Sequence, residues 1–170
     1  MKARALGVRV ANLRIGLVLG TDGGMLAQML PAFEYGCGAR FGKGRHWMPW
    51  IDRDDLVRLI AHTISASALS GPVNAVAPAP VQNRDFVAIL GRALHRPVPF
   101  AIPTPLLCLA AGDLARELFL AGQRVVPEKA LASGFVFNWP TLDAALATML
   151  GARAPQRPQI TVATTRLSHS

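Results

Sequence analysis

The sequence predicts a single α/β domain in which short apolar strands alternate with amphipathic helices. The chain has 170 residues, which is a usual length for one domain and enough to bury a hydrophobic core. Hydrophobic residues make up 51% of it and charged residues only 16%, which favours a compact fold over a disordered chain. Runs rich in Val, Leu and Ile are followed by stretches with apolar residues three and four positions apart, which is the pattern of strands followed by helices.

The first part of the chain predicts a strand, a turn and a helix. Residues 8–19 are rich in Val, Leu and Ile, and we expect one strand that is covered on both faces. The glycines of residues 20–24 match neither G-x-G-x-x-G nor G-x-x-x-x-G-K-[ST], so we interpret them as a plain turn and not as a phosphate cradle. Helical spacing then runs through Met25, Leu26, Met29, Leu30 and Phe33. Pro31 should kink this helix or fix one of its end turns.

Residues 42–56 combine a Gly-x-Gly turn, two tryptophans and three carboxylates. Trp47 and Trp50 predict a short buried strand that includes residue 51, because bulky apolar residues between turn signals suit a covered, pleated surface. The carboxylates are Asp52, Asp54 and Asp55. The first stands where it can N-cap the next helix, and the other two fall in its first turn, where the helix dipole favours negative charge. We therefore interpret all three as capping groups.

Later elements are predicted by the same spacing and by residues that begin or end helices. We expect a helix at 53–68, a strand at 72–76, a helix capped by Asn83 and ended by residues 95–97, a strand at 98–102, a helix at 106–121 closed by Gly122, a helical turn ended by residues 133–134, a strand-like pair at Phe135 and Phe137, and a helix from Thr141 to Leu150. The apolar face of the first helix is expected to contain Leu56, Val57, Ile60 and Ile64. Residues 1–151 would form the folded unit, and 152–170 a loose tail.

Charge and cysteine content exclude several classes of function. The net charge is +8, but the eighteen Lys and Arg residues are scattered and form no known nucleic-acid motif, so no specific nucleic-acid partner is expected. Acidic or phosphorylated small molecules remain compatible with this charge. Cys37 and Cys108 are too far apart for a metal-binding pair, which favours a reduced, cytoplasmic protein without a metal site. The most apolar window, residues 97–112, is too short to span a bilayer and contains four prolines, so no membrane association is expected.

Residues 42–56 also carry a family resemblance. Extended short-chain dehydrogenase/reductases of the nucleotide-sugar epimerase and dehydratase type often contain Gly-Asp-Gly-x-Gln-x-Arg-Asp-Phe-Val-His-Val-Asp-Asp-Leu. This chain aligns with that run, without a gap, at Gly42, Gly44, Asp54, Asp55 and Leu56. Trp47, Trp50 and Ile51 make the stretch more similar to an epimerase-like branch that has a C-terminal extension of unknown function. Residues 122–150 resemble that extension.

The resemblance covers roughly residues 7–150 and implies the C-terminal portion of a Rossmann-type fold, namely its last parallel strands and a small mixed α/β substrate lobe. The family binds NAD(P) through a glycine-rich turn and uses a Tyr-x-x-x-Lys pair, in which the lysine lowers the tyrosine pKa. Neither pattern is present here, since the one tyrosine is Tyr35 and residue 39 is alanine. The chain would thus begin just after the catalytic lysine. It would be inactive and bind no NAD(P) alone, although NAD(P) is implied for the complete family fold.

The resemblance also implies which residues would flank a substrate cleft. They are Arg14, His46, Met48 and Trp50. His46 replaces a glutamine of the family and could donate a hydrogen bond to a sugar hydroxyl or carbonyl, or it could be a surface histidine. Met48 replaces an arginine that binds substrate phosphate, which argues against a nucleotide diphosphate at that position. No catalytic, cofactor-binding or metal-binding residue is predicted.

Three functions follow from these observations. The first is the substrate-binding portion of an NAD(P)-dependent nucleotide-sugar epimerase-like or dehydratase-like protein, with a sugar-like substrate. The alternatives are a non-catalytic interaction module that has kept the lobe's fold and, less favoured, a basic nucleic-acid-binding domain. Residues 8–19 would lack their family neighbours and expose an open strand edge, which is a template for pairing. We therefore expect a homo-oligomer or a missing nucleotide-binding half as partner.

Overall fold

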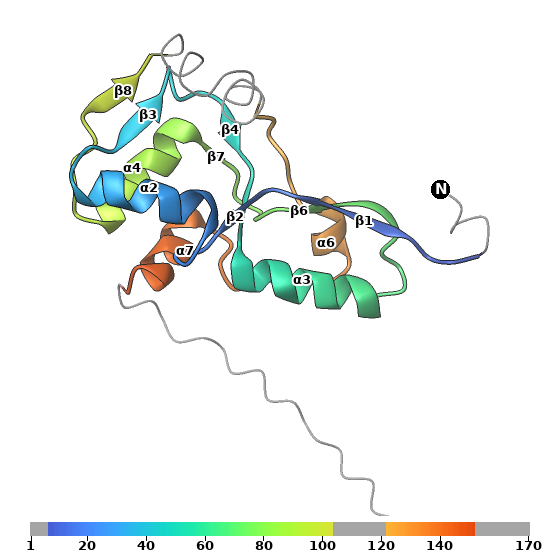
Figure 1. The fold of residues 1–170 in the computed structure, drawn as a ribbon. Helices are drawn as coiled ribbons and strands as arrows, with labels where there is room; N and C mark the ends of the chain where they lie inside the picture. Colours follow the sequence, from blue (N-terminus) through green and yellow to red (C-terminus); the bar gives the residue numbers. More distant parts are fainter. Residues whose placement is uncertain (1–6, 104–121, 152–170) are drawn as a thin grey trace, which may run out of the picture.

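The computed structural model describes residues 7–103 and 122–151 (Figure 1). The order of elements is β1 Ala11–Ile15, β2 Leu17–Leu19, α2 Gly24–Glu34, β3 Ala39–Phe41, β4 Trp47–Met48, β5 Trp50–Asp52, α3 Arg53–Ser65, β6 Gly71–Ala75, β7 Val81–Gln82, α4 Asn83–Ala93, β8 Phe100–Ile102, α6 Glu128–Ala132 and α7 Leu142–Met149. The helix expected at 106–121, Cys108 and the tail at 152–170 lie outside the described residues. The fold is mixed α/β with parallel strands, as the sequence predicts.

The strand expected at residues 8–19 is two strands. β1 pairs in parallel with β6, and β2 pairs in parallel with β5. The change of partner falls at Gly16, whose N–H donates to the Ala75 carbonyl over 3.2 Å, while the N–H of Leu17 donates to Pro49 over 2.7 Å. A Cβ on Gly16 would lie 2.5 Å from the Pro49 carbonyl oxygen, so only glycine lets the segment cross here.

The strand expected at residues 47–51 is also split. β4 pairs antiparallel with β7, whereas β5 joins β2. Pro49 separates the two, because it has no N–H to donate to a ladder. Elsewhere, β3 pairs in parallel with β8. The predicted strands at 72–76 and 98–102 are confirmed as β6 and β8. Phe135 and Phe137 are both buried with an exposed residue between them, but they lie in no strand.

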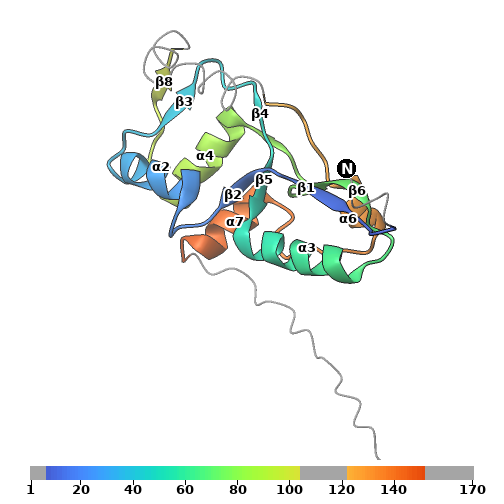
Figure 2. The ribbon, with the colours of Figure 1, turned by 45° about the vertical axis from the view of Figure 1, so that its right-hand side comes forward.

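Two hydrophobic clusters organise the described residues. The lobe cluster comprises Leu19, Leu26, Phe33, Met48, Trp50, Ala77, Phe86, Val87, Leu90, Trp139, Leu142, Ala145 and Leu146. The sheet cluster comprises Ile51, Leu56, Leu59, Ala75, Ala130, Phe135 and Phe137. Figures 1 and 2 show α2, α4 and α7 grouped at one end of the molecule and α3 and α6 beside β1 and β6 at the other.

The expectation that the first strand is covered on both faces is wrong. Leu13 packs against the sheet cluster, but Asn12, Arg14 and Ile15 are exposed, Ile15 by 52%. Asn12 and Arg14 lie on the face that no described element covers, while Leu13 lies on the face toward the sheet cluster, as in a strand covered on one side. Ile15 shares the face of Leu13 but stands at the end of the strand and does not pack against the sheet cluster.

The predicted face of α3 is also wrong. Of the four apolar residues expected inside, only Leu56 is buried, whereas Val57, Ile60 and Ile64 are 60%, 37% and 72% exposed. The core face instead carries Asp55, Leu56, Leu59 and Thr63. The hydroxyl of Thr63 donates to the Leu59 carbonyl over 2.7 Å, which makes a polar residue acceptable in this face.

The helices of the lobe agree better with the sequence. In α2, Leu26 and Phe33 are buried and Pro31 lies in the last turn, as expected. Asn83, however, does not cap α4, since residue 82 holds the cap position. The Asn83 side chain is buried and accepts from the N–H of Phe41 over 2.9 Å, so it supports a neighbouring strand instead.

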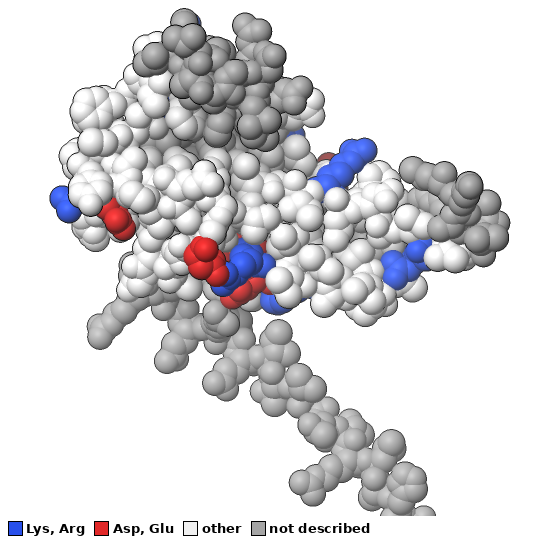
Figure 3. Space-filling model, in the orientation of Figure 1, with Lys and Arg blue, Asp and Glu red and all other residues white. Residues whose placement is uncertain are grey.

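The surface agrees with the expectation of scattered charge. On the face drawn in Figure 3, basic residues stand apart and form no stripe. None of the described helices is long and apolar enough to cross a membrane.

Candidate functional site

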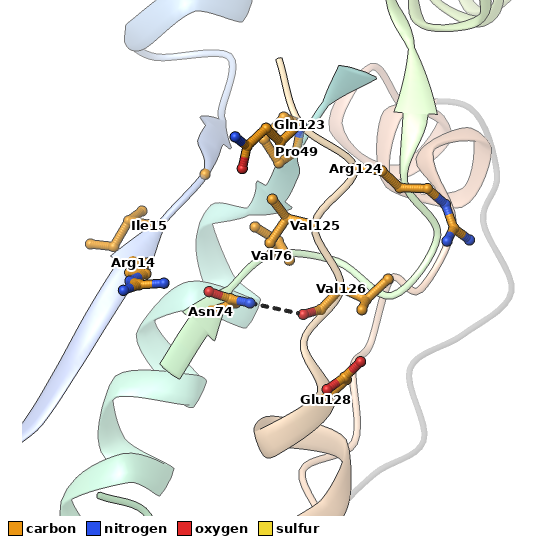
Figure 4. A pocket seen from close by; sticks show the side chains of 11 residues that line it. Arg14, Ile15, Pro49, Asn74, Val76, Gln123, Arg124, Val125, Val126 and Glu128 are labelled. Carbon is orange, nitrogen blue, oxygen red and sulfur yellow. Dashed lines mark hydrogen bonds between the residues drawn. The ribbon is translucent and has the colours of Figure 1, made fainter. Parts of the chain in front are cut away.

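The candidate site is a cavity of about 410 Å³ at the carboxyl ends of β1 and β6 (Figure 4). It is lined by Arg14, Ile15, Gly16, Pro49, Asn74, Val76, Gln123, Arg124, Val125, Val126 and Glu128. The carboxyl ends of parallel strands are where open α/β sheets usually bind ligands. Its volume falls within the range of small-molecule pockets.

Two strands and a later segment position the polar groups of this cavity. Arg14 and Asn74 face each other in the β1–β6 ladder. The Asn74 side-chain nitrogen donates to the Val126 carbonyl over 3.1 Å, which holds the later segment against β6 (Figure 4). The Arg14 side chain makes no ion pair or hydrogen bond with the other residues that the structure describes, and the same holds for Glu128 at the start of α6.

Arg124, the second arginine of the cavity, is turned outward. Figure 4 shows its side chain pointing away from Arg14 and Asn74. Its guanidinium carbon lies 5.7 Å from the centre of the Trp47 ring, which is a cation–π contact. The backbone just before it passes close to the same residue, because a Cβ on Gly122 would lie only 1.8 Å from the Trp47 carbonyl oxygen. Arg14 is therefore the cation available within the cavity.

The four residues expected to flank a substrate cleft do not share one cavity. Arg14 lines the cavity described above, but His46, Met48 and Trp50 do not. Met48 and Trp50 are 3% and 1% exposed in the lobe cluster. The Trp50 indole donates to the Ala79 carbonyl over 3.1 Å, and Met48 sulfur accepts from Asn83 over 3.3 Å.

His46 is partly buried at the start of the lobe. Its Nε2 atom is buried and has no hydrogen-bond partner among residues 7–103 and 122–151. Burial lowers the pKa of His46, because the charged imidazolium loses solvation. The neutral ring is thus favoured in the folded state.

A second cavity, of about 200 Å³, lies at the start of α3, and its lining includes the N-cap residue of that helix. The Asp52 carboxylate accepts from the N–H of Asp54 over 2.8 Å and of Asp55 over 3.1 Å, which confirms the predicted cap. Burial raises the pKa of Asp52, despite these two bonds. Arg53 forms an ion pair with Asp22, and this hydrogen bond lowers the pKa of Asp22.

Asp55 does more than the sequence indicates. It is fully buried, and its carboxylate accepts from Arg58 over 2.7 Å. It also accepts from the N–H of Asn138 and of Trp139, each over 3.0 Å. This carboxylate therefore joins α3 to the segment that leads into α7.

Sequence reasoning missed Asn74, Gln123 and Glu128 as cavity residues. Asn74 could have been found, since it lies near the end of a predicted strand of a parallel sheet. The other two come from a segment about fifty residues later in the chain, and no local signal places it beside β6. In the part of the chain that is described, no three His, Cys, Asp or Glu side chains could hold a metal ion together.

This chain is similar in sequence to epimerase family proteins. A family model described as a domain of unknown function, DUF1731, matches residues 102–149. An epimerase family protein of Mycobacterium bovis is 44% identical over 144 residues, which are 85% of this chain and 48% of that protein. The human epimerase family protein SDR39U1 is 36% identical over 138 residues, which are 81% of this chain and 47% of that protein. The chain thus spans about half the length of these relatives.

Solved structures show the same relationship. The human SDR39U1 structure with NADPH has a TM-score of 0.81 and 33% identity, and the match covers 85% of this chain and 49% of that chain. A nucleoside-diphosphate sugar epimerase from Corynebacterium glutamicum has a TM-score of 0.69 and 34% identity, over 89% of this chain and 28% of that chain. UDP-glucose 4-epimerase from Thermus thermophilus, in complex with NAD, has a TM-score of 0.64 at 14% identity over 88% of this chain and 48% of that chain, which indicates a shared fold.

Proposed function

Because this chain matches the C-terminal part of epimerase family proteins, we propose that it supplies the substrate-binding side of an NAD(P)-dependent nucleotide-sugar epimerase-like or dehydratase-like protein. The observation that carries the proposal is the cavity at the carboxyl ends of β1 and β6. In a sheet of this kind, strand ends supply ligand contacts, and a nucleotide-binding half supplies the cofactor.

The outer edge of β1 supports the need for a second part. Among the described residues, β1 pairs with β6 and with no other strand. A groove lies between β1 and α3, and its walls include Leu13, Ile60 and Ile64. A bare strand edge beside apolar side chains is a pairing template. A parallel strand from a nucleotide-binding half would complete the sheet and cover this groove.

The chain alone would be inactive. The family pair Tyr-x-x-x-Lys is absent from its sequence, and Tyr35, at the end of α2, is 84% exposed. NAD(P) is proposed for the assembled fold only, because the human SDR39U1 structure contains NADPH. The substrate would be a sugar-like small molecule.

A non-catalytic interaction module is the second candidate, and the same bare edge favours it. A second copy of the chain could cover the β1 edge and the exposed face of α3. The two candidates differ in the partner that the edge accepts.

The test uses this chain together with the unmatched N-terminal part of the Mycobacterium bovis relative, made as a separate polypeptide. Sedimentation measures their association, and calorimetry measures NADPH binding. We expect a complex that binds NADPH, and no NADPH binding by this chain alone. Micromolar binding by the chain alone would contradict the proposal. Self-association without any complex would favour the interaction module.

A further inference from the structure

The cavity contains two opposite charges that do not neutralise each other. Arg14 and Glu128 both line it, and no ion pair joins them. Ionic contacts engage four other described arginines in this chain, which has only ten acidic residues; they are Arg53, Arg58, Arg84 and Arg92. A guanidinium that faces a cavity and has no carboxylate partner among residues 7–103 and 122–151 is open to an anion from outside.

From these groups we infer that the cavity binds a single sugar ring that carries one carboxylate or phosphate group, with Arg14 binding the anion and Glu128 accepting hydrogen bonds from hydroxyls. This inference rests on the proposed function, because it takes the cavity as the substrate site. It adds the chemical class of the substrate and the orientation in which it binds.

Arg14 is suited to fixed recognition of an anion. Its backbone is held in the parallel ladder opposite Asn74 and next to the close crossing at Gly16. A planar guanidinium can donate two parallel hydrogen bonds to a carboxylate or a phosphate, which fixes the orientation of the ligand. Because the Arg124 side chain is turned toward Trp47, Arg14 is the arginine that is placed to bind the anion.

The rest of the cavity suits a neutral, hydroxylated body. The Glu128 carboxylate accepts hydrogen bonds, so it favours hydroxyl groups and disfavours a second anion. The Asn74 side-chain nitrogen is already used by Val126, which leaves its oxygen as an acceptor. Apolar walls are supplied by Ile15, Pro49, Val76 and Val125. Such walls can contact the C–H face of a sugar ring.

Size limits the ligand as well. The cavity measures about 410 Å³, which is near the lower end of the range for small-molecule pockets. One ring with its acidic group suits this volume better than a whole nucleoside diphosphate sugar. Met48, which replaces the family's phosphate-binding arginine, is buried in the lobe cluster and offers no charge to a diphosphate.

The experiment is a nuclear magnetic resonance titration of the isotope-labelled chain. The probes are glucuronate, which carries a carboxylate, glucose 6-phosphate, which carries a phosphate, and neutral glucose. We expect millimolar glucuronate or glucose 6-phosphate to shift the backbone amides of Ile15, Gly16 and Asn74, and glucose to leave them unchanged. The charged probe that binds more tightly identifies the anionic group.

Variants distinguish specific binding by Arg14 from a general attraction of anions to a basic protein. Arg14→Gln should weaken binding of the preferred probe by about tenfold or more, and Arg14→Lys should weaken it less, because a lysine keeps the charge but not the bidentate geometry. Arg40→Gln is the matched control, since Arg40 is an exposed arginine on another short strand, β3, and does not line the cavity. Equal binding by the Arg14→Gln and Arg40→Gln variants would overturn the inference. So would the absence of shifts with both charged probes.

The titration and the assembly experiment can fail independently of each other. If the relative's N-terminal part assembles with this chain and NADPH binds, but neither charged probe shifts the cavity amides of the assembled complex, this inference fails and the proposed function stands. If a charged probe binds at Arg14 but no complex forms, the proposed function fails and the binding site remains.

Discussion

The lobe cluster and the sheet cluster differ in how completely the chain encloses them. Around the lobe cluster, α2, α4 and α7 pack with the strands, and among the described residues only Tyr35 and Phe100 are large hydrophobic residues left exposed in that region. Around the sheet cluster, the exposed ones are Val8, Ile15, Val57, Ile60, Ile64, Leu131 and Val136. The described residues therefore leave more large apolar side chains exposed on the sheet side, which favours that side as an interaction surface.

The two edges of the β1–β6 pair show the same difference on a smaller scale. A later segment of the chain lies beside β6, because the Asn74 side chain donates to the Val126 carbonyl and α6 contacts this strand. At β1, no described strand pairs with the outer edge. The described chain therefore contacts the β6 side and leaves the outer edge of β1 without a strand.

Two matched leucines compare the clusters directly. Leu90 of α4 in the lobe cluster and Leu59 of α3 in the sheet cluster are both fully buried helix residues. We expect Leu90→Ala to lower the free energy of unfolding by about 4 kcal/mol and Leu59→Ala by about 2 kcal/mol, because a less enclosed site collapses around the deletion more easily. Urea unfolding measures both values. Equal losses would mean that the sheet cluster is as well enclosed as the lobe cluster.

Asp55 on α3 anchors the segment that leads into α7. Asp55→Ala removes the buried carboxylate that accepts from the N–H groups of Asn138 and Trp139 and from one nitrogen of Arg58, so we expect a loss of about 3 kcal/mol in the free energy of unfolding. Urea unfolding checks this value as well. The control is Asp143→Ala, which removes an exposed ion pair with Arg92 and should change stability far less. Similar losses in both variants would show that the Asp55 contacts do not anchor this segment.

Self-association should depend on the β1 side alone. We expect the chain to associate at micromolar concentration through the β1 edge and the exposed face of α3. Ile64 on α3 is 72% exposed, and Tyr35 after α2, on the lobe side, is 84% exposed, so Tyr35 serves as the control. Ile64→Lys should raise the dissociation constant about tenfold, because it places a charge in the contact, and Tyr35→Lys should leave it unchanged. Sedimentation at several concentrations measures both. A clean monomer at every concentration would show that the chain needs no copy to cover β1.

How far the sequence predicts this structure depends on the range of the interaction concerned. Capping by Asp52 was predictable, because the carboxylate and the two N–H groups that donate to it are two and three residues apart. The buried face of α3 was not, because its apolar residues, Val57 among them, surround most of the helix and only tertiary packing selects the inner side. The splits at Gly16 and Pro49 carry local signals, but the partners of the resulting strands do not follow from them.

The same distinction applies to the candidate site. Family resemblance identified Arg14, which does line the cavity. It did not identify Glu128, which reaches β6 from more than fifty residues away. Asp55 was interpreted from its place in a first helical turn, and its bonds to residues 138 and 139 are invisible at that range. Residues that act across the chain were therefore the ones that the sequence missed.

The smallest effect concerns pH and should be confined to the lobe side. Burial lowers the pKa of His46 below that of an unfolded histidine, about 6.5, so the unfolded chain binds more protons as the pH falls. The contribution of His46 to stability is thus complete above pH ~6.5 and is lost as the pH falls toward the folded pKa. Asp52 has the opposite sign, since its raised pKa gives stability below about 3.8 that is lost as the pH rises through the folded value.

His46→Gln separates the two contributions, because Asp52 is present in both proteins. The wild-type chain should lose stability between pH ~7 and ~5 relative to the variant, by less than in any of the changes above, since His46 is only partly buried and solvent screens its charge. Urea unfolding at a series of pH values measures the difference. Self-association of the two proteins should respond to pH alike, because His46 lies in the lobe and not at the β1 edge. Parallel stability curves would show that the buried Nε2 gains a partner in solution and that the lobe is not sensitive to this proton.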